Sequence, residues 1–179
     1  MKKIALLALL GCFQWGVSQK YIDRAGEVRF EASMPALEEV AATNKSASAI
    51  LNATTGDLAA LILVKGFKFK VPLMEEHFNE NYVESDKFPK STFKGKIMNF
   101  DPAKHSGKAS YDAEGDFTMH GVTKKIKIKV SMTKSDGGFQ AQTQFGIKPE
   151  DYNIEIPNVV RNKISKSIEI TCKFDLKAS

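Results

Sequence analysis

The sequence from residue 109 to residue 119 reads Ala109-Ser110-Tyr111-Asp112-Ala113-Glu114-Gly115-Asp116-Phe117-Thr118-Met119. Every odd-numbered residue in it is apolar or small, and every even-numbered residue is polar. Because successive side chains of a β-strand point to opposite faces of the sheet, this alternation is typical of a strand with one buried face and one wet face. The stretch therefore favours an antiparallel sheet that covers a core on one side only.

The same alternation recurs on both sides of this stretch. Weaker patterns upstream also indicate strands, although their ends are less sharply marked. The full set of predicted strands is 28–33, 45–54, 57–70, 91–100, 109–119, 125–132, 139–147 and 167–176. Turn signals separate several of them, namely Thr54-Thr55-Gly56-Asp57, His120-Gly121-Val122-Thr123 and Asp136-Gly137-Gly138. We therefore expect eight strands joined mostly by hairpins.

One segment has helical rather than strand periodicity. Met74, Phe78 and Tyr82 recur at every fourth residue. Pro72 suits the first turn of a helix, and acidic residues follow it, as the helix dipole favours. We therefore predict one short helix, residues 71–82, in an otherwise all-β protein.

Eight antiparallel strands with one wet face can stack as a sandwich or close into an up-and-down barrel. The interior of an eight-stranded barrel is either filled by side chains or holds one small ligand. Small residues on the apolar phase leave room inside such a barrel. They are Ala47, Ala49, Ala109, Ala113, Gly115 and Ala141. A solid core, in which large and small residues interdigitate, is the alternative that the pattern alone leaves open.

The length and composition suit one globular domain. The chain has 179 residues, of which 42% are hydrophobic and 26% are charged. The formal net charge of +5 falls to +3 when Lys2 and Lys3 are removed with the leader described next. Because binding to nucleic acid relies on a strongly basic surface, this mild charge argues against a nucleic-acid partner.

The first 19 residues have the pattern of a secretory signal peptide. Two lysines precede an apolar run, residues 4–10, and small residues follow at Gly16 and Ser18. We therefore assign residues 1–19 to a signal peptide and residues 20–179 to one exported domain, periplasmic or secreted.

The leader also bears on the cysteines. An alternative interpretation takes Leu9-Leu10-Gly11-Cys12 as a lipoprotein box, which would anchor the protein through a lipid on Cys12. With the signal peptide removed, Cys172 is the only cysteine left, so no intramolecular disulfide can form. Cys172 falls on the inward phase of its strand, where we expect a buried and unreactive thiol.

No residue pattern in the chain points to catalysis or to a metal. His77, His105 and His120 are dispersed and lack a metal-ligand spacing. The sequence has no Gly-x-Ser-x-Gly, no His-Glu-x-x-His and no glycine-rich phosphate loop. We therefore expect no metal, no cofactor and no enzyme activity.

Three segments resemble the YceI family, the polyisoprenoid-binding, lipocalin-like proteins that many bacteria export. Residues 77–95 resemble the stretch in which a helix end leads through a Phe-Pro into a strand. Residues 115–124, Gly-Asp-Phe-Thr-Met-His-Gly-Val-Thr-Lys, are similar to the family's Gly-x-Leu-Thr-x-His/Asn-Gly-Val-Thr-Lys, with Phe117 in place of leucine. Phe145-Gly146-Ile147 is similar to the Phe-Gly-Ile of the penultimate strand. The order and spacing cover nearly all of the chain from Tyr21 onward.

The resemblance implies an eight-stranded antiparallel lipocalin-like barrel with a helix beside it, enclosing a long apolar tunnel for an isoprenoid chain. Such a tunnel needs only apolar lining and length, because burial of hydrocarbon is favourable by roughly 25 cal/mol per Å². The expected lining residues are Phe30, Ile62, Phe67, Phe69, Met74, Phe78, Phe93, Ile97, Tyr111, Phe117, Ile128 and Phe145. We also expect the substitution Ala113→Phe to block a long ligand.

A polar headgroup would need hydrogen-bond donors at the mouth of the tunnel. Thr123 and Lys124 lie in one basic turn and Arg161 in another, which makes them candidates. Plain solvated turns explain the same three residues more simply, and we favour that interpretation.

The sequence leaves three functions in competition. The first is a carrier that sequesters a polyisoprenoid, a quinone-like lipid or a similar amphiphile, with at most transient contact to a membrane. The second is an exported barrel with a filled core whose outer surface binds a protein. The third is an enzyme that acts on a hydrophobic substrate held in the barrel. The oligomeric state stays open, with a homodimer among the alternatives.

Overall fold

The computed structural model describes residues 19–35 and 38–179. The signal peptide, apart from its last residue, and the alternative lipid anchor on Cys12 lie outside the described residues. The strands are β1 (Lys20–Ser33), β2 (Ala41–Asn52), β3 (Asp57–Leu63), β4 (Lys68–Phe69), β5 (Lys90–Ile97), β6 (Lys108–Met119), β7 (Val122–Ser135), β8 (Gly138–Ile147) and β9 (Ile164–Ala178). The helical segments are η1 (Val64–Gly66), α1 (Pro72–His77), η2 (Phe78–Tyr82) and η3 (Pro149–Tyr152).

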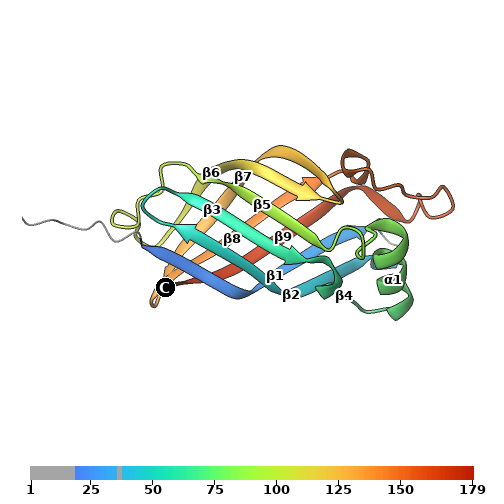
Figure 1. Ribbon diagram of the computed structural model, residues 1–179, viewed down its shortest axis with the longest axis horizontal. Helices are drawn as coiled ribbons and strands as arrows, with labels where there is room; N and C mark the ends of the chain where they lie inside the picture. The colour runs from blue at the N-terminus through green and yellow to red at the C-terminus, as the bar shows by residue number, and fades with distance from the viewer. Residues whose placement is uncertain (1–18, 36–37) are drawn as a thin grey trace, which may run out of the picture.

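Eight of the strands close into an antiparallel up-and-down barrel (Figure 1). Neighbouring strands follow the order β1-β9-β8-β7-β6-β5-β3-β2, and β2 pairs with β1 again. The closure is visible at Val28 of β1, which lies opposite Asn44 of β2 and Cys172 of β9. The prediction of an eight-stranded barrel is therefore confirmed, and the sandwich is excluded. The short β4 adds only a two-residue pairing beside the start of β2.

The hairpin between β6 and β7 shows how the sequence sets the register. His120 and Gly121 both have positive φ, 50° and 73°, as a tight hairpin turn with two left-handed residues needs. Beyond the turn, Phe117 pairs with Lys124 and Ala113 pairs with Ile128. Alternation then sends the odd residues of β6 into the barrel, so that Ala113 is 1% exposed.

The strand predicted for residues 57–70 is interrupted, which corrects the sequence interpretation. The buried side chain of Asn44 donates a hydrogen bond from Nδ2 to the carbonyl of Leu63 at 2.8 Å. Gly66 then lies so close that a Cβ there would be 2.5 Å from the same amide nitrogen. The chain therefore leaves the sheet in the single turn η1 before it pairs again in β4.

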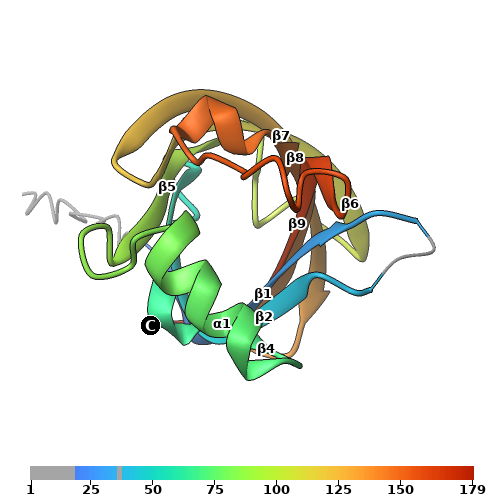
Figure 2. The same ribbon diagram turned by 90° about the vertical axis from the view of Figure 1, so that its right-hand side faces the viewer.

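The helix predicted for residues 71–82 is confirmed as α1 and the wider π-helical turn η2 that continues it. Pro72 stands in the first turn, where its missing N–H costs nothing. Glu75 fixes the start of the helix, because its carboxylate accepts hydrogen bonds from Lys68 Nζ at 2.5 Å and from the backbone N–H of Phe69 at 3.2 Å. The helix lies across one end of the barrel (Figure 2).

The two ends of the barrel are packed differently. At the end that holds both chain termini of the domain, Leu51, Ile97 and Met132 are at most 1% exposed, and the ring of Tyr21 packs edge-on against Phe139. The end beside α1 instead surrounds a cavity. No helix in the described part of the chain is both long and apolar enough to cross a membrane.

Candidate functional site

An apolar cavity of about 650 Å³ occupies the half of the barrel beside α1. Its walls come from the inward faces of the strands, and its rim comes from three segments that surround this end of the barrel (Figure 2). These rim segments are the connection between β1 and β2, the chain from Val71 to Tyr82, and the connection from Ile147 to Ile164 between β8 and β9. The cavity is within the size range of sites for small organic ligands.

Ten of the twelve residues predicted to line a tunnel lie on this cavity. They are Phe30, Ile62, Phe67, Phe69, Met74, Phe78, Phe93, Phe117, Ile128 and Phe145. Alternation explains the strand residues, because a single apolar phase in each strand faces the interior. The two residues from α1 and η2 reach the same space because the helix lies over the open end.

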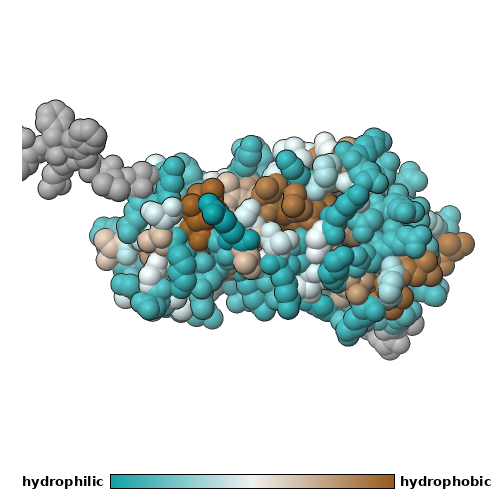
Figure 3. All heavy atoms as spheres, turned by 60° about the horizontal axis from the view of Figure 1, so that its bottom comes forward, coloured by the Kyte–Doolittle hydropathy of each residue, from teal (hydrophilic) through white to brown (hydrophobic). Residues whose placement is uncertain are grey.

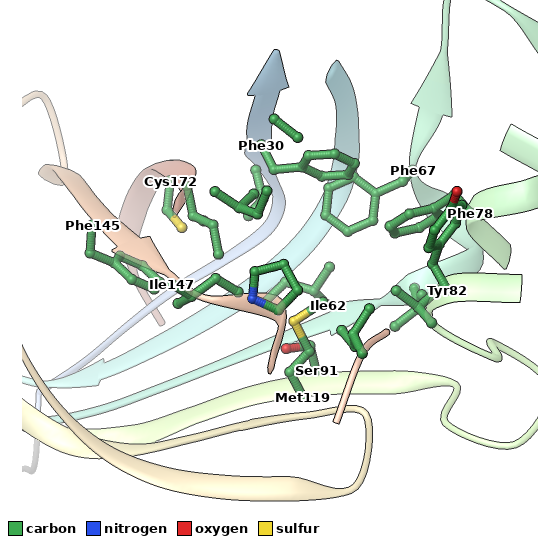
Figure 4. A pocket seen from close by; sticks show the side chains of 18 of the residues that line it. Phe30, Ile62, Phe67, Phe78, Tyr82, Ser91, Met119, Phe145, Ile147 and Cys172 are labelled. Atoms are coloured by element: carbon green, nitrogen blue, oxygen red, sulfur yellow. The ribbon is translucent and has the colours of Figure 1, made fainter. Parts of the chain in front are cut away.

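Four phenylalanines form one wall beside the helix. The ring of Phe78 stacks on Phe30 at a centroid distance of 5.3 Å, and it lies 5.8 Å from Phe67 and 5.2 Å from Phe69. Figure 4 shows Phe30, Phe67 and Phe78 together on one side of the cavity, with Tyr82 next to Phe78. This aromatic wall joins β1, the chain around β4, and the helix.

The opposite wall comes from β6, β8, β9 and η3. Phe117 packs edge-on against Phe145 at 5.7 Å and against Tyr152 at 5.6 Å. Cys172 also lines this side (Figure 4), and its burial raises the pKa of the thiol to about 12. Burial of this thiol indicates an environment of low polarity on this side of the cavity. Tyr152, whose phenol also has a pKa raised by desolvation, packs behind Phe117 and does not line the cavity.

The polar groups on the walls are already satisfied. Ser91 Oγ donates to the carbonyl of Thr118 at 2.9 Å, and Thr143 Oγ1 donates to the carbonyl of Lys129 at 2.9 Å. The charged or titratable lining side chains other than Cys172 lie on the rim segments; they are Glu38, His77, Tyr82 and Lys163. The interior therefore suits hydrocarbon, and any polar part of a ligand must remain at the rim.

Ile97 and Tyr111 do not line the cavity, which corrects two of the predicted positions. Both are on inward phases but near the filled end of the barrel. Tyr111 packs perpendicular to Phe100 at 5.3 Å, and its hydroxyl lies 2.8 Å from His105 Nδ1. Ala113 is also absent from the lining, so the expected blocking substitution is misplaced. The tunnel expected along the barrel is thus a cavity closed at one end.

The three predicted headgroup residues also lie away from the cavity. Thr123 Oγ1 is 2.8 Å from Thr118 Oγ1 on the outer face, and Lys124 forms an ion pair of 2.6 Å with Asp151. Arg161 donates to the carbonyl of Ile156 at 3.3 Å. Lys124 and Arg161 therefore stabilise the chain between β8 and β9 rather than face the interior.

Several lining residues were missed because they lie in that same connection. Ile154, Ile156, Val160 and Ile164 all line the cavity. They follow no strand or helix period over a useful length, so pattern analysis treats them as loop residues. The one available signal is their composition, since three β-branched residues in a loop, followed by Ile164 at the start of β9, are unusual.

A buried histidine fastens this connection to the helix side of the rim. His120 Nδ1 is 2.9 Å from the carbonyl oxygen of Tyr152, and His120 Nε2 is 2.9 Å from Glu84 Oε2. The contact with His120, together with Lys87, holds the pKa of the Glu84 carboxyl below its usual value. Both ring nitrogens of His120 are thus engaged in this contact. Among the described residues, no group of three or more His, Cys, Asp or Glu side chains could hold a metal ion.

Comparison with known proteins agrees with this architecture. A domain from Saccharophagus degradans, described as a polyisoprenoid binding domain implicated in plant cell wall breakdown, matches with a TM-score of 0.75 and 16% identity, over 90% of this chain and 99% of that one. BcnA from Burkholderia cenocepacia matches with a TM-score of 0.69 and 16% identity, over 84% of this chain and 94% of that one. A YceI protein from Campylobacter jejuni matches with a TM-score of 0.63 and 15% identity, over 100% of this chain and 99% of that one.

At identities of 15% to 16%, these structures show a shared fold. A search of curated proteins gave no match. The family itself is shown by the sequence, because the family model described as YceI-like domain matches residues 21–176, which is nearly all of the barrel. The chain therefore belongs to the YceI-like domain family.

Proposed function

We propose that the protein binds the hydrocarbon chain of a polyisoprenoid, a quinone-like lipid or a similar long-chain amphiphile inside the barrel. The observation that carries the proposal is the cavity of about 650 Å³, walled by aromatic and aliphatic side chains and closed at one end. Burial of hydrocarbon gains about 0.8 kcal/mol per CH₂, so each five-carbon unit contributes roughly 4 kcal/mol before the costs of ordering it.

The geometry determines which end of the ligand enters the barrel first. The filled end of the barrel leaves no route past Ile97, Met132 and Phe139. A long chain therefore enters tail first from the end beside α1, and its polar head stays near Glu38, His77 and Lys163 on the rim. The printed description of the Saccharophagus degradans domain as polyisoprenoid binding supports a ligand of this class.

We further propose that the protein binds this lipid after export and acts as a carrier or a store rather than as an enzyme. The leader at residues 1–19 supports export, and a periplasmic location fits a lipid that must be shielded from water. The cavity walls support binding without catalysis, because their polar groups are engaged with the backbone.

Native mass spectrometry of protein purified without detergent tests the lipid proposal. A discrete mass adduct, released by organic solvent and identified as an isoprenoid or quinone, is the expected result. Protein without an adduct is next incubated with polyprenyl lipids in solution. If it then takes up none of them, the proposal is wrong and the cavity serves another ligand.

Cell fractionation of a bacterial host that expresses the full chain tests export. The expected product is in the periplasm or medium and begins near residue 20. An uncleaved product in the cytoplasm contradicts export, and a product in the membrane fraction with a lipid on Cys12 favours the anchored form.

A further inference from the structure

Large apolar side chains gather outside the cavity as well as inside it. In the described part of the chain, seven of them are conspicuously exposed, and four of these seven surround the cavity mouth. The four are Met34 at 36%, Val71 at 37%, Leu73 at 56% and Val159 at 84% exposed. Figure 3 shows hydrophobic side chains reaching the surface at the end of the molecule where α1 lies.

These four residues come from all three rim segments. Met34 directly follows Ser33, which pairs with Ile164 at the far end of the connection between β8 and β9. Val71 and Leu73 begin the helical segment and also border the cavity. Val159 lies in the β8–β9 connection, which projects beyond the end of the barrel (Figure 1). The apolar side chains therefore ring the opening instead of forming a patch on one wall.

The β8–β9 part of the rim also carries a group of basic residues. Residues 157–166 include Arg161, Lys163 and Lys166 but no aspartate or glutamate. Among the described residues, none of these three cations has an ion-pair partner. Across the opening the cations are neutralised, because Lys68 pairs with Glu75 and Lys70 pairs with Glu39.

We propose that this rim is a docking surface for an anionic lipid bilayer. The side chains of Met34, Val71, Leu73 and Val159 insert into the interface between headgroups and acyl chains, and Arg161, Lys163 and Lys166 bind the anionic headgroups. Apolar side chains beside unpaired cations are the combination that favours such an interface over water. In the docked state the mouth faces the acyl region, so a long lipid passes between bilayer and cavity without crossing water.

Co-sedimentation with vesicles tests the docking surface. The vesicles contain phosphatidylcholine alone or phosphatidylcholine mixed with phosphatidylglycerol. We expect the mature protein to bind the mixed vesicles and to dissociate as salt is added. The double variant Met34→Ser/Val159→Ser and the double variant Arg161→Gln/Lys166→Gln should each lose binding at least fivefold.

The other end of the barrel supplies matched controls. Met98 is 46% exposed, similar to the rim residues, but it follows β5 at the filled end. Lys134 is exposed near the same end. Met98→Ser and Lys134→Gln should bind vesicles as the parent protein does. Equal binding by the rim variants and these controls overturns the proposal.

A second copy of the chain is the competing occupant of an apolar rim. Light scattering over a range of concentrations distinguishes the two occupants. The bilayer proposal is overturned if the parent protein forms a concentration-dependent dimer, Val159→Ser disrupts this dimer, and the parent protein does not bind vesicles.

The docking proposal rests on the proposed function only in that docking would serve to transfer the bound lipid. The two proposals can fail separately. Met34, Val159, Arg161 and Lys166 do not line the cavity, so the variants should retain the lipid adduct in native mass spectra. Vesicle binding by a protein that takes up no lipid refutes the proposed function alone. A lipid-loaded protein that ignores both kinds of vesicle refutes the docking surface alone.

Discussion

His120 Nε2 lies 2.9 Å from Glu84 Oε2, and the other ring nitrogen of His120 lies 2.9 Å from the carbonyl oxygen of Tyr152. The carbonyl oxygen of Tyr152 and the carboxylate of Glu84 are both hydrogen-bond acceptors, and each lies against one of the two ring nitrogens. The contact joins the connection after the helix, the β6–β7 turn and the end of η3. A single side chain thus holds together segments on both sides of the cavity mouth.

The first prediction concerns acid stability. The hydrogen bond from His120 lowers the pKa of Glu84 in the folded state. A carboxyl group whose pKa is lowered in the folded state stabilises the fold at pH values above its ordinary pKa, about 4.3. This contribution is lost as the pH falls through the lowered pKa. We expect Glu84→Gln to reduce the dependence of stability on pH in this acid range, as measured by urea unfolding at pH 7 and below pH 4.

Glu114 provides the control for this measurement, because it forms only an exposed pair with Lys127 at 3.4 Å. Glu114→Gln should leave the pH dependence close to that of the parent protein. An equal loss of pH dependence in both variants would show that the effect is general and not due to the contact with His120.

The second prediction uses two buried alanines. Ala141 lines the cavity and is 7% exposed, whereas Ala113 is 1% exposed and lies outside the lining. A phenylalanine at 141 can extend into empty space, so Ala141→Phe should abolish lipid uptake at little cost in stability. Ala113→Phe should instead overpack its surroundings, at a cost of about 1–3 kcal/mol, and keep lipid uptake.

Native mass spectra with added polyprenyl lipid, together with urea unfolding, check this pair. The reverse pattern, with uptake lost only in Ala113→Phe, would contradict the position that we give to the ligand.

The fold was predictable because alternation is a local signal that the barrel does not override. The strands, the hairpin at His120 and Gly121, and the helix at Pro72 are all encoded within short windows. What pattern could not show is the break at Leu63, since it depends on the amide of Asn44, nineteen residues earlier in the chain. Such a contact has no local signature.

For the site, the sequence predicted which face of each strand lines the barrel, but not which part of the strand lies at the cavity. Alternation identifies which residues point inward, but it does not tell which end of a barrel is filled. Ile97 and Tyr111 therefore had the same pattern as Phe93 and Phe117. Gly115 illustrates the same limit. Its small size predicted room for a ligand, but in the structure it leaves no room in the cavity. It lies opposite Gly95, where a Cβ on either residue would be 2.4 Å from a carbonyl oxygen of the other strand.

The third prediction concerns the thiol of Cys172. Because burial raises its pKa to about 12, almost none of it is thiolate at pH 8. The mature protein should therefore react very slowly with a charged thiol reagent at this pH and rapidly after unfolding in urea. The exposed position of Met98 supplies the control, since the thiol introduced by Met98→Cys should react at the rate of a free cysteine. Fast labelling of native Cys172 would contradict the closed wall around it.

The fourth prediction compares two phenylalanines at opposite ends of the barrel. Phe78 is partly buried in the aromatic wall at the mouth, and Phe139 is 3% exposed among Tyr21, Phe100 and His105 at the filled end. Phe139→Ala should cost about 3–5 kcal/mol of stability and leave lipid exchange unchanged, because it creates a cavity far from the mouth. Phe78→Ala should cost less, about 1–3 kcal/mol, since part of its ring is already in water.

The exchange rate is the measurement that separates these two positions. Phe78 stacks on Phe30 across the route by which a chain must enter, so its removal should speed both uptake and release of a fluorescent polyene fatty acid. Because uptake and release change together, the affinity should move less than either rate does. If lipid exchange in Phe78→Ala matches that of the parent protein, the helix is not the barrier to the cavity, and lipid must pass between the strands instead.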